Sequence, residues 1–310
     1  MVKEGKNRLD IICIGAVGID SNVYLYSNQI DFKVEMNFSQ IIDSVGQAGG
    51  YSSLIMNNFG LTTGLIGYVG DDFFGIYIKT IFLERKISTL WFIDPEGTKR
   101  SFNLMNKKGE RKNFYDGKGS MDVKPDLVLC EKFLSQASMA HFNIVNWSRN
   151  LLPIAKKLGL IISCDIQDIV DLKDTYRTDF IIASDILFLS AINFENLDYL
   201  IKEIRKLNSE AVMVIGMGAR GSALCFKDDE YTIYPPPELD LPLIDTNGAG
   251  DSLAMGFLFA YKILKKSLEE SLLIGQINAR FTCSMKTPKT NFLSKSVLLE
   301  HFEKLKVNYY

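Results

Sequence analysis

The segment best suited to chemistry is DTNGAGD at residues 245–251, which an apolar run follows at once. The small residues Gly248, Ala249 and Gly250 let the backbone bend closely around a ligand. They open a helix, so their free N–H groups and the helix dipole would form a site for an anion. Asp251 falls in the first turn of that helix, where its carboxylate could accept the proton of a substrate hydroxyl during phosphoryl transfer.

A purely structural role for Asp251 is the alternative, because an acid in the first turn of a helix also stabilises the helix dipole. That role explains one acidic residue. It does not explain two acids, Asp245 and Asp251, on either side of a Gly-Ala-Gly turn. We therefore interpret the segment as a phosphoryl-transfer site.

Strand-like and helix-like runs alternate along the rest of the chain. The apolar run at residues 11–15 suits a strand that is buried on both faces of a parallel sheet. The alternation predicts a doubly wound α/β core, with a mostly parallel sheet and helices on both faces. Further strands are expected near residues 63–69, 138–145, 160–165, 186–190 and 211–216, and helices near residues 47–59, 72–85, 148–158, 193–207 and 270–284.

Two stretches interrupt the alternation. Residues 21–38 are typical of a hairpin, and residues 89–120 of two or three strands with basic residues concentrated between Lys99 and Lys118. A solvated surface meander is the ordinary interpretation of such a charge run. If the core binds phosphate, a small β lid over the site becomes the better interpretation. We expect a discontinuous lid (21–38 and 89–120) on a core formed by residues 10–20, 39–88 and 121–310.

Four segments resemble motifs of the ribokinase-like (PfkB-type) carbohydrate kinases. DTNGAGD resembles the DTxGAGD signature of that family, and the strand and turn at residues 11–20 resemble its opening segment, which ends in a substrate-binding aspartate. GYVGDDFFG at residues 67–75 and GMGARGS at residues 216–222 are similar to the G-x-V-G-x-D-x-x-G segment and the T-x-G-x-x-G turn. The four motifs occur in the family's order, from about residue 10 to about residue 285.

The resemblance implies a Rossmann-like α/β fold with a small β-sheet lid. It implies an enzyme that transfers the γ-phosphoryl group of ATP to a hydroxyl of a sugar, sugar acid or nucleoside. Asp251 would be the general base, and the backbone of Gly248, Ala249 and Gly250 would be the anion hole. Mg²⁺ would neutralise the phosphates, and a monovalent cation is an optional further cofactor.

The resemblance also implies the remaining site residues. The alcohol substrate would contact Asp20, Gly46, Gln47, Gly50, Tyr51 and Asp251. Asn143 joins them as a candidate sugar contact, because it ends a strand that faces the expected cleft. ATP would lie near Ser190, Gly216, Gly218, Gly221, Asn247, Gly248, Gly250 and Asn278, and the metal near Asp245 and Asn193.

Three positions depart from the family pattern. Gln47 replaces a glycine of the GGxxxN signature, and Tyr51 stands where an asparagine usually contacts substrate. The NxxE motif is displaced, with Asn193 followed by Glu195, and Gln167 replaces the asparagine of a D-x-N segment. These changes motivate a second hypothesis, a non-catalytic sugar- or nucleotide-binding homologue.

Other function classes fit less well. Residues 15–18 lack the G-x-G-x-x-G pattern of a dinucleotide-binding enzyme, and the chain contains no GxxxxGK[ST] segment of a P-loop. With only His141 and His301, a three-histidine zinc site is excluded, and His141 is expected to be a core residue. The 35 basic and 37 acidic residues give a net charge of −2, so nucleic acid is not an expected partner.

The remaining composition indicates a cytoplasmic protein. The first apolar run is too short for the core of a signal peptide, and no apolar run reaches the roughly 20 residues of a membrane span. The five cysteines are scattered, as in proteins of a reducing compartment. A homodimer through the lid is a further expectation, because exposed edge strands favour pairing with a second copy.

Overall fold

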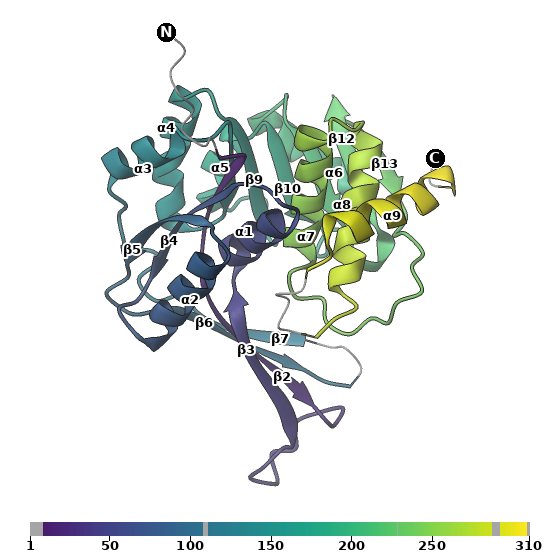
Figure 1. Ribbon diagram of the computed structural model, residues 1–310. Coiled ribbons are helices and arrows are strands. Elements are labelled where there is room, and N and C mark those ends of the chain that lie inside the picture. The colour runs from purple at the N-terminus through teal and green to yellow at the C-terminus, as the bar shows by residue number, and fades with distance from the viewer. Residues whose placement is uncertain (1–8, 108–110, 228, 287–291, 309–310) are drawn as a thin grey trace.

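A computed structural model describes residues 9–107, 111–227, 229–286 and 292–308 of the chain. A large sheet carries helices on both faces, and a smaller sheet projects from one edge of this core, at the bottom of Figure 1. Within the described residues, no helix is both long enough and apolar enough to cross a bilayer. The expected α/β core with a small additional sheet is confirmed.

The large sheet is parallel except at one edge. Its central strand, β1 (Ile11–Ile14), lies between β4 (Thr63–Val69) and β8 (Met139–Asn143). The chain proceeds from β1 toward one edge and later from β8 toward the other, so β1 and β8 flank the topological switch point, where open α/β sheets bind ligands. The other strands are β5 (Ser88–Ile93), β9 (Ile161–Asp168), β10 (Ile186–Ser190) and β11 (Val212–Gly216), followed by the antiparallel β12 (Ser222–Lys227) and β13 (Glu230–Tyr234).

Alternate residues of β1 feed two separate cores. Ile12 and Ile14 pack under α3 (Leu127–Leu134), α4 (Leu152–Lys157), α5 (Thr178–Ala183) and α6 (Leu197–Leu207). Ile11 and Cys13 pack under the helices of the opposite face, and all four side chains are fully buried. Those helices are α1 (Ala48–Asn58), α2 (Phe73–Glu84), α7 (Ala249–Leu258), α8 (Leu268–Thr282) and α9 (Lys295–Leu305).

The smaller sheet, called the lid below, has the strand order β3 (Ser39–Gly46), β2 (Gly18–Leu25), β6 (Lys99–Met105) and β7 (Arg111–Asp116). Its pairing corrects two expected boundaries. Residues 39–46, expected in the core, pair with β2 along their whole length. Residues 88–93, expected mostly in the lid, pair with β4 in the large sheet, where Trp91 packs edge-on against Phe82.

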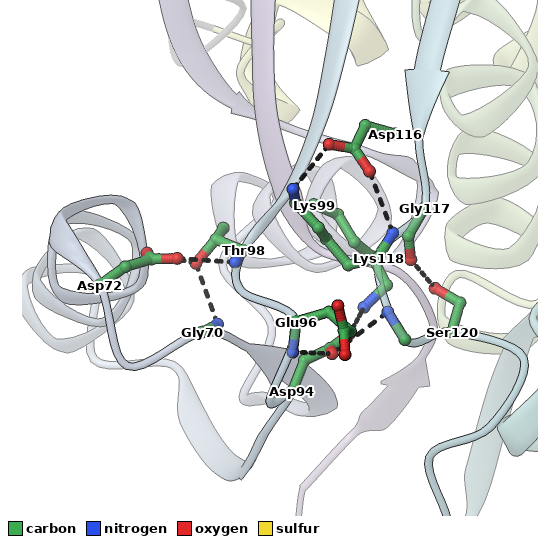
Figure 2. A network of polar contacts seen from close by, with 11 residues as sticks. Gly70, Asp72, Asp94, Glu96, Thr98, Lys99, Asp116, Gly117, Lys118 and Ser120 are labelled. Carbon is green, nitrogen blue, oxygen red and sulfur yellow. Dashed lines mark hydrogen bonds and ion pairs between the residues drawn. The ribbon is translucent and has the colours of Figure 1, made fainter.

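A buried ion pair marks the point where the chain passes from β5 of the core into β6 of the lid. Lys99 Nζ lies 2.9 Å from Asp94 Oδ2, and both side chains are almost completely buried (Figure 2). Burial lowers the pKa of Lys99, while the bond to Asp94 partly opposes that shift. Lys99 was expected among the basic residues covering the site, and this expectation is wrong, because its ammonium lies inside the hinge.

Asp72 ties the same crossing to the core. As the N-cap of α2, it accepts a hydrogen bond from Gly75 N at 2.8 Å. Its carboxylate also accepts from Thr98 N at 2.7 Å and Thr98 Oγ1 at 2.6 Å, while Thr98 Oγ1 accepts from Gly70 N (Figure 2). The residue just before β6 is therefore held by a helix terminus of the core.

Candidate active site

The DTNGAGD segment forms the entry to α7, as its sequence predicts. Gly248 is the N-cap and has a φ of 75°, a left-handed conformation that glycine adopts without a steric penalty. Ala249 begins the helix, and Asp251 lies half-buried in its first turn. The N–H groups of this turn are those that a helix leaves without an internal partner, so they are available to an anion.

Helix α7 is held rigidly behind that turn. Gly256 lies so close to α8 that a Cβ there would approach Gly275 Cα to 2.8 Å. Ser252 Oγ shares a 2.7 Å hydrogen bond with Thr282 Oγ1, and Asn278 Nδ2 donates to Ser252 O at 2.8 Å. Asn278, predicted to border the adenine, is fully buried in this contact between the two helices.

A second group of polar side chains surrounds Asp20, whose carboxylate is almost fully buried. It accepts hydrogen bonds from Tyr51 Oη at 2.7 Å, Gln47 Nε2 at 2.9 Å and Asn247 Nδ2 at 2.9 Å. Burial raises the pKa of Asp20, and the three donors partly oppose that rise. The cluster joins β2 of the lid, α1 of the core and the DTNGAGD segment around one carboxylate.

Tyr51 connects this cluster with the entry to α7. Its hydroxyl accepts from Asn247 Nδ2 at 3.0 Å, and a Cβ on Gly248 would lie 3.6 Å from its ring. Burial and the neighbouring Asp20 raise the pKa of Tyr51 well above its ordinary value, so the phenol remains a donor. The residue that departs from the family pattern therefore lies at the centre of the candidate site.

Gln47 occupies a backbone conformation that explains why the family has glycine there. Its φ of 68° and ψ of 157° lie in a region that is essentially restricted to glycine, at a cost of about 1–3 kcal/mol. Its side chain donates to Asp20 and, at 2.7 Å, to Ser101 Oγ of the lid. The neighbouring Gly46 has no alternative, because a Cβ there would lie 2.2 Å from Asp20 Cγ.

The lid touches the DTNGAGD segment at two further points, which sequence reasoning missed. Tyr24 Oη of β2 donates to Asp245 Oδ2 at 2.9 Å, and Arg111 Nη1 of β7 donates to Asn247 Oδ1 at 3.0 Å. Asp245, predicted as a metal contact, also accepts from Asn247 N at 2.8 Å. Only the aromatic and basic character of the lid hinted at these contacts, which depend on the fold for their position.

Asn143 lies at the switch point of the large sheet, at the end of β8. A Cβ on Gly15, just after β1, would lie 2.7 Å from Asn143 Oδ1, so the glycine makes room for this side chain. Asn143 Nδ2 lies 3.3 Å from His141 Nε2, and His141 Nδ1 lies 3.0 Å from Ser163 Oγ. Burial lowers the pKa of His141 to about 3, so this histidine is a neutral core residue, as expected.

The residues predicted to approach ATP gather at the carboxyl ends of β10 and β11. Ser190 and Gly216 are adjacent in register. Gly218 and Gly221 form the turn into β12, in which a Cβ on Gly221 would lie only 2.1 Å from Tyr234 O. Asn193 is exposed beside Asp168, with its Nδ2 3.4 Å from the carboxylate. Gly50, predicted to contact the alcohol, is buried in the first turn of α1.

This geometry, a doubly wound core with a glycine-opened helix facing a small lid, is that of the ribokinase-like kinases. The profile described as pfkB family carbohydrate kinase matches residues 8–293, so the chain belongs to this family. It is a phosphotransferase with an alcohol group as acceptor.

Known proteins resemble the chain over nearly its whole length. An acarbose 7(IV)-phosphotransferase of Actinoplanes sp. is 23% identical over 294 residues, which cover 94% of this chain and 97% of the relative. A nucleoside kinase of Methanocaldococcus jannaschii is 26% identical and covers 96% and 98%. The solved structure of a microbiome-derived acarbose kinase has a TM-score of 0.89 at 24% identity, with 96% and 99% covered.

Proposed function

We propose that the protein transfers the γ-phosphoryl group of ATP to a hydroxyl of a sugar, sugar acid or nucleoside. The observation that carries this proposal is the position of Asp251 in the first turn of α7, next to the left-handed Gly248 and the buried cluster around Asp20. The site thus combines a base, an anion-binding helix terminus and hydroxyl-binding groups.

In the proposed reaction, Asp251 accepts the proton of the substrate hydroxyl as its oxygen attacks the γ-phosphorus. The bond to the β-phosphate oxygen breaks, and ADP leaves with the electron pair. The N–H groups of the turn at Gly248, Ala249 and Gly250 hold the charge on the transferring group. Asp20, with Tyr51 and Gln47, orients the acceptor alcohol.

Magnesium, which the family implies, would neutralise the charge of the phosphates. Within the described residues, no group of three or more His, Cys, Asp or Glu side chains could hold a metal ion. Mg²⁺ commonly binds through one or two carboxylates together with waters and substrate phosphates. Asp168 and Asn193, side by side at the carboxyl edge of the sheet, fit that demand. Asp245 is bonded to Tyr24 and the backbone instead.

The test is ADP release from MgATP in the presence of monosaccharides, sugar acids, oligosaccharides including acarbose, and nucleosides. Asp251→Asn should lower turnover about 10²–10⁴-fold, the usual contribution of a general base, while calorimetry shows that ATP still binds. Asp198→Asn is the matched control, because Asp198 occupies the first turn of α6 and should leave turnover unchanged.

Two outcomes would overturn parts of this proposal. If no alcohol gives ADP above the ATPase background, the non-catalytic binding homologue becomes the better interpretation. If Asp251→Asn turns over as fast as the unchanged protein, the proton is accepted elsewhere.

A further inference from the structure

The lid is amphipathic in the opposite sense to an ordinary sheet packed on a core. Its outer face exposes apolar side chains, among them Ile41, Phe102 and Phe114, which are 60%, 42% and 56% exposed. The alternate residues of the same strands are polar and buried, for example Ser44 and Asn103. One-sided antiparallel sheets usually bury their apolar face, so the buried polar face of the lid calls for a polar partner.

That polar face is the one directed at the candidate active site. Side chains two residues apart along a strand share a face. Asp20 and Tyr24 of β2 both bond to the DTNGAGD segment, at Asn247 and Asp245 respectively. Asn22 lies between them on the same face.

Asn22 begins a row of three asparagines that crosses the lid, called the asparagine row below. It pairs in register with Asn103 of β6, and Asn103 pairs with Asn113 of β7. Asn113 Nδ2 donates to Asn103 Oδ1 at 2.6 Å, and Asn22 Nδ2 donates to Asp20 O at 3.0 Å. Neither Asn22 nor Asn103 has any exposed surface.

Two atoms of the row have no hydrogen-bond partner. They are Asn22 Oδ1, an acceptor, and Asn103 Nδ2, a donor, and the nearby Ser44 Oγ is also unpartnered. A buried polar atom without a partner costs about 1–3 kcal/mol, and native proteins contain few of them. Substrate hydroxyl groups, each of which both donates and accepts, would satisfy this set.

We propose that the asparagine row is a second subsite, which binds a hydroxylated unit beyond the one that is phosphorylated. This inference rests on the proposed function and narrows its substrate class to oligosaccharides or glycosides. A step of two residues along β2 is about 7 Å, so a ligand that reaches both Asp20 and the row must extend past the reacting unit. The row carries no charge, which suits neutral hydroxyls better than the carboxylate of a sugar acid.

The test compares sugars of increasing length. For the sugar that the protein phosphorylates best, kcat/KM is measured for the single unit and for its two- and three-unit oligomers. The longer substrates should be preferred at least about tenfold, which corresponds to about 1.4 kcal/mol. Asn103→Leu should remove about tenfold from the oligomers and leave the single unit unchanged. Phe102→Leu, on the outer face of the same strand, should change neither value.

Thermal unfolding of the same variants separates binding from packing. Leucine is close to asparagine in size, so Asn103→Leu should fold with an unchanged or raised Tm. If the variant changes Tm but not the preference for longer substrates, the row is structural and the inference fails. A preference for nucleosides over oligosaccharides would also overturn it, while the kinase activity stands. If no alcohol is phosphorylated at all, the proposed function fails, and calorimetric titration of unchanged protein and Asn103→Leu with the oligomers still tests the row.

Discussion

The buried pair of Lys99 and Asp94 at the lid hinge should be a major determinant of stability. In Lys99→Met, the Asp94 carboxylate loses a cation at 2.9 Å and keeps two backbone donors, Glu96 N at 3.1 Å and Gly119 N at 3.2 Å. With an effective dielectric constant near 20, the lost attraction is about 6 kcal/mol. Because measured losses for breaking a buried pair are about 3–5 kcal/mol, we expect the free energy of unfolding to fall by that amount.

Two further variants give this prediction its controls. Lys118 and Asp116, a few residues away, form a 2.7 Å pair that remains partly exposed to solvent (Figure 2). Lys118→Met should therefore cost at most about 1 kcal/mol. The double variant Lys99→Met with Asp94→Asn should recover much of the loss, because it removes the uncompensated charge and keeps an acceptor for the two N–H groups.

Urea unfolding followed by circular dichroism and tryptophan fluorescence measures these differences, and coincident transitions are required for a chain of this length. The reasoning would be refuted if Lys99→Met and Lys118→Met cost the same. It would equally be refuted if the double variant were less stable than Lys99→Met alone, because Asp94 would then not be the unpaired charge.

Gln47→Gly should raise KM for the alcohol at least about tenfold, because Asp20 loses a charge-assisted donor, while relief of the backbone strain of about 1–3 kcal/mol keeps Tm near its original value; a large fall in Tm would contradict the strain. Asp165→Asn should flatten the pH dependence of stability. Burial raises the pKa of Asp165 from 3.8 to about 6, so the folded state holds the proton more tightly, and stability falls as pH rises through that window. The loss amounts to about 3 kcal/mol at pH 7. Unfolding of the unchanged protein and the variant at pH 4 and pH 7 checks this, and parallel profiles would rule it out.

The sequence predicts the fold well because its signals are local. The apolar run at residues 11–15, the helix entry at Gly248 and the cap at Asp72 each specify structure within a few neighbouring residues. Strand β5 and strand β3 were assigned to the wrong sheet, because β pairing is decided by partners far along the chain. Nothing near Ser39 states that it pairs with Leu25.

The same limit explains what sequence reasoning missed in the site. Tyr24 and Asp245 are 221 positions apart, yet they share a hydrogen bond. A lysine such as Lys99 is almost never expected inside a protein unless it is paired, and its partner could not be identified from composition. The asparagine row depends on the register of three strands. Asn22, Asn103 and Asn113 are unremarkable as separate residues in the sequence.

Other expectations stay predictions. The homodimer, the monovalent cation and the cytoplasmic location each depend on a second chain, an ion or a cell. The assignment of Ser190, Gly216, Gly218 and Gly221 to ATP awaits a nucleotide complex.

The division of labour between lid and core has a consequence for how such an enzyme can diversify. The groups proposed for phosphoryl transfer lie on α7, whereas the asparagine row lies on β2, β6 and β7. A substitution in the row can alter which acceptor fits without touching Asp251 or the turn before it. Acceptor range and catalytic chemistry could therefore evolve separately, and exchanging the inner-face residues of three strands would be a direct route to engineer new acceptors.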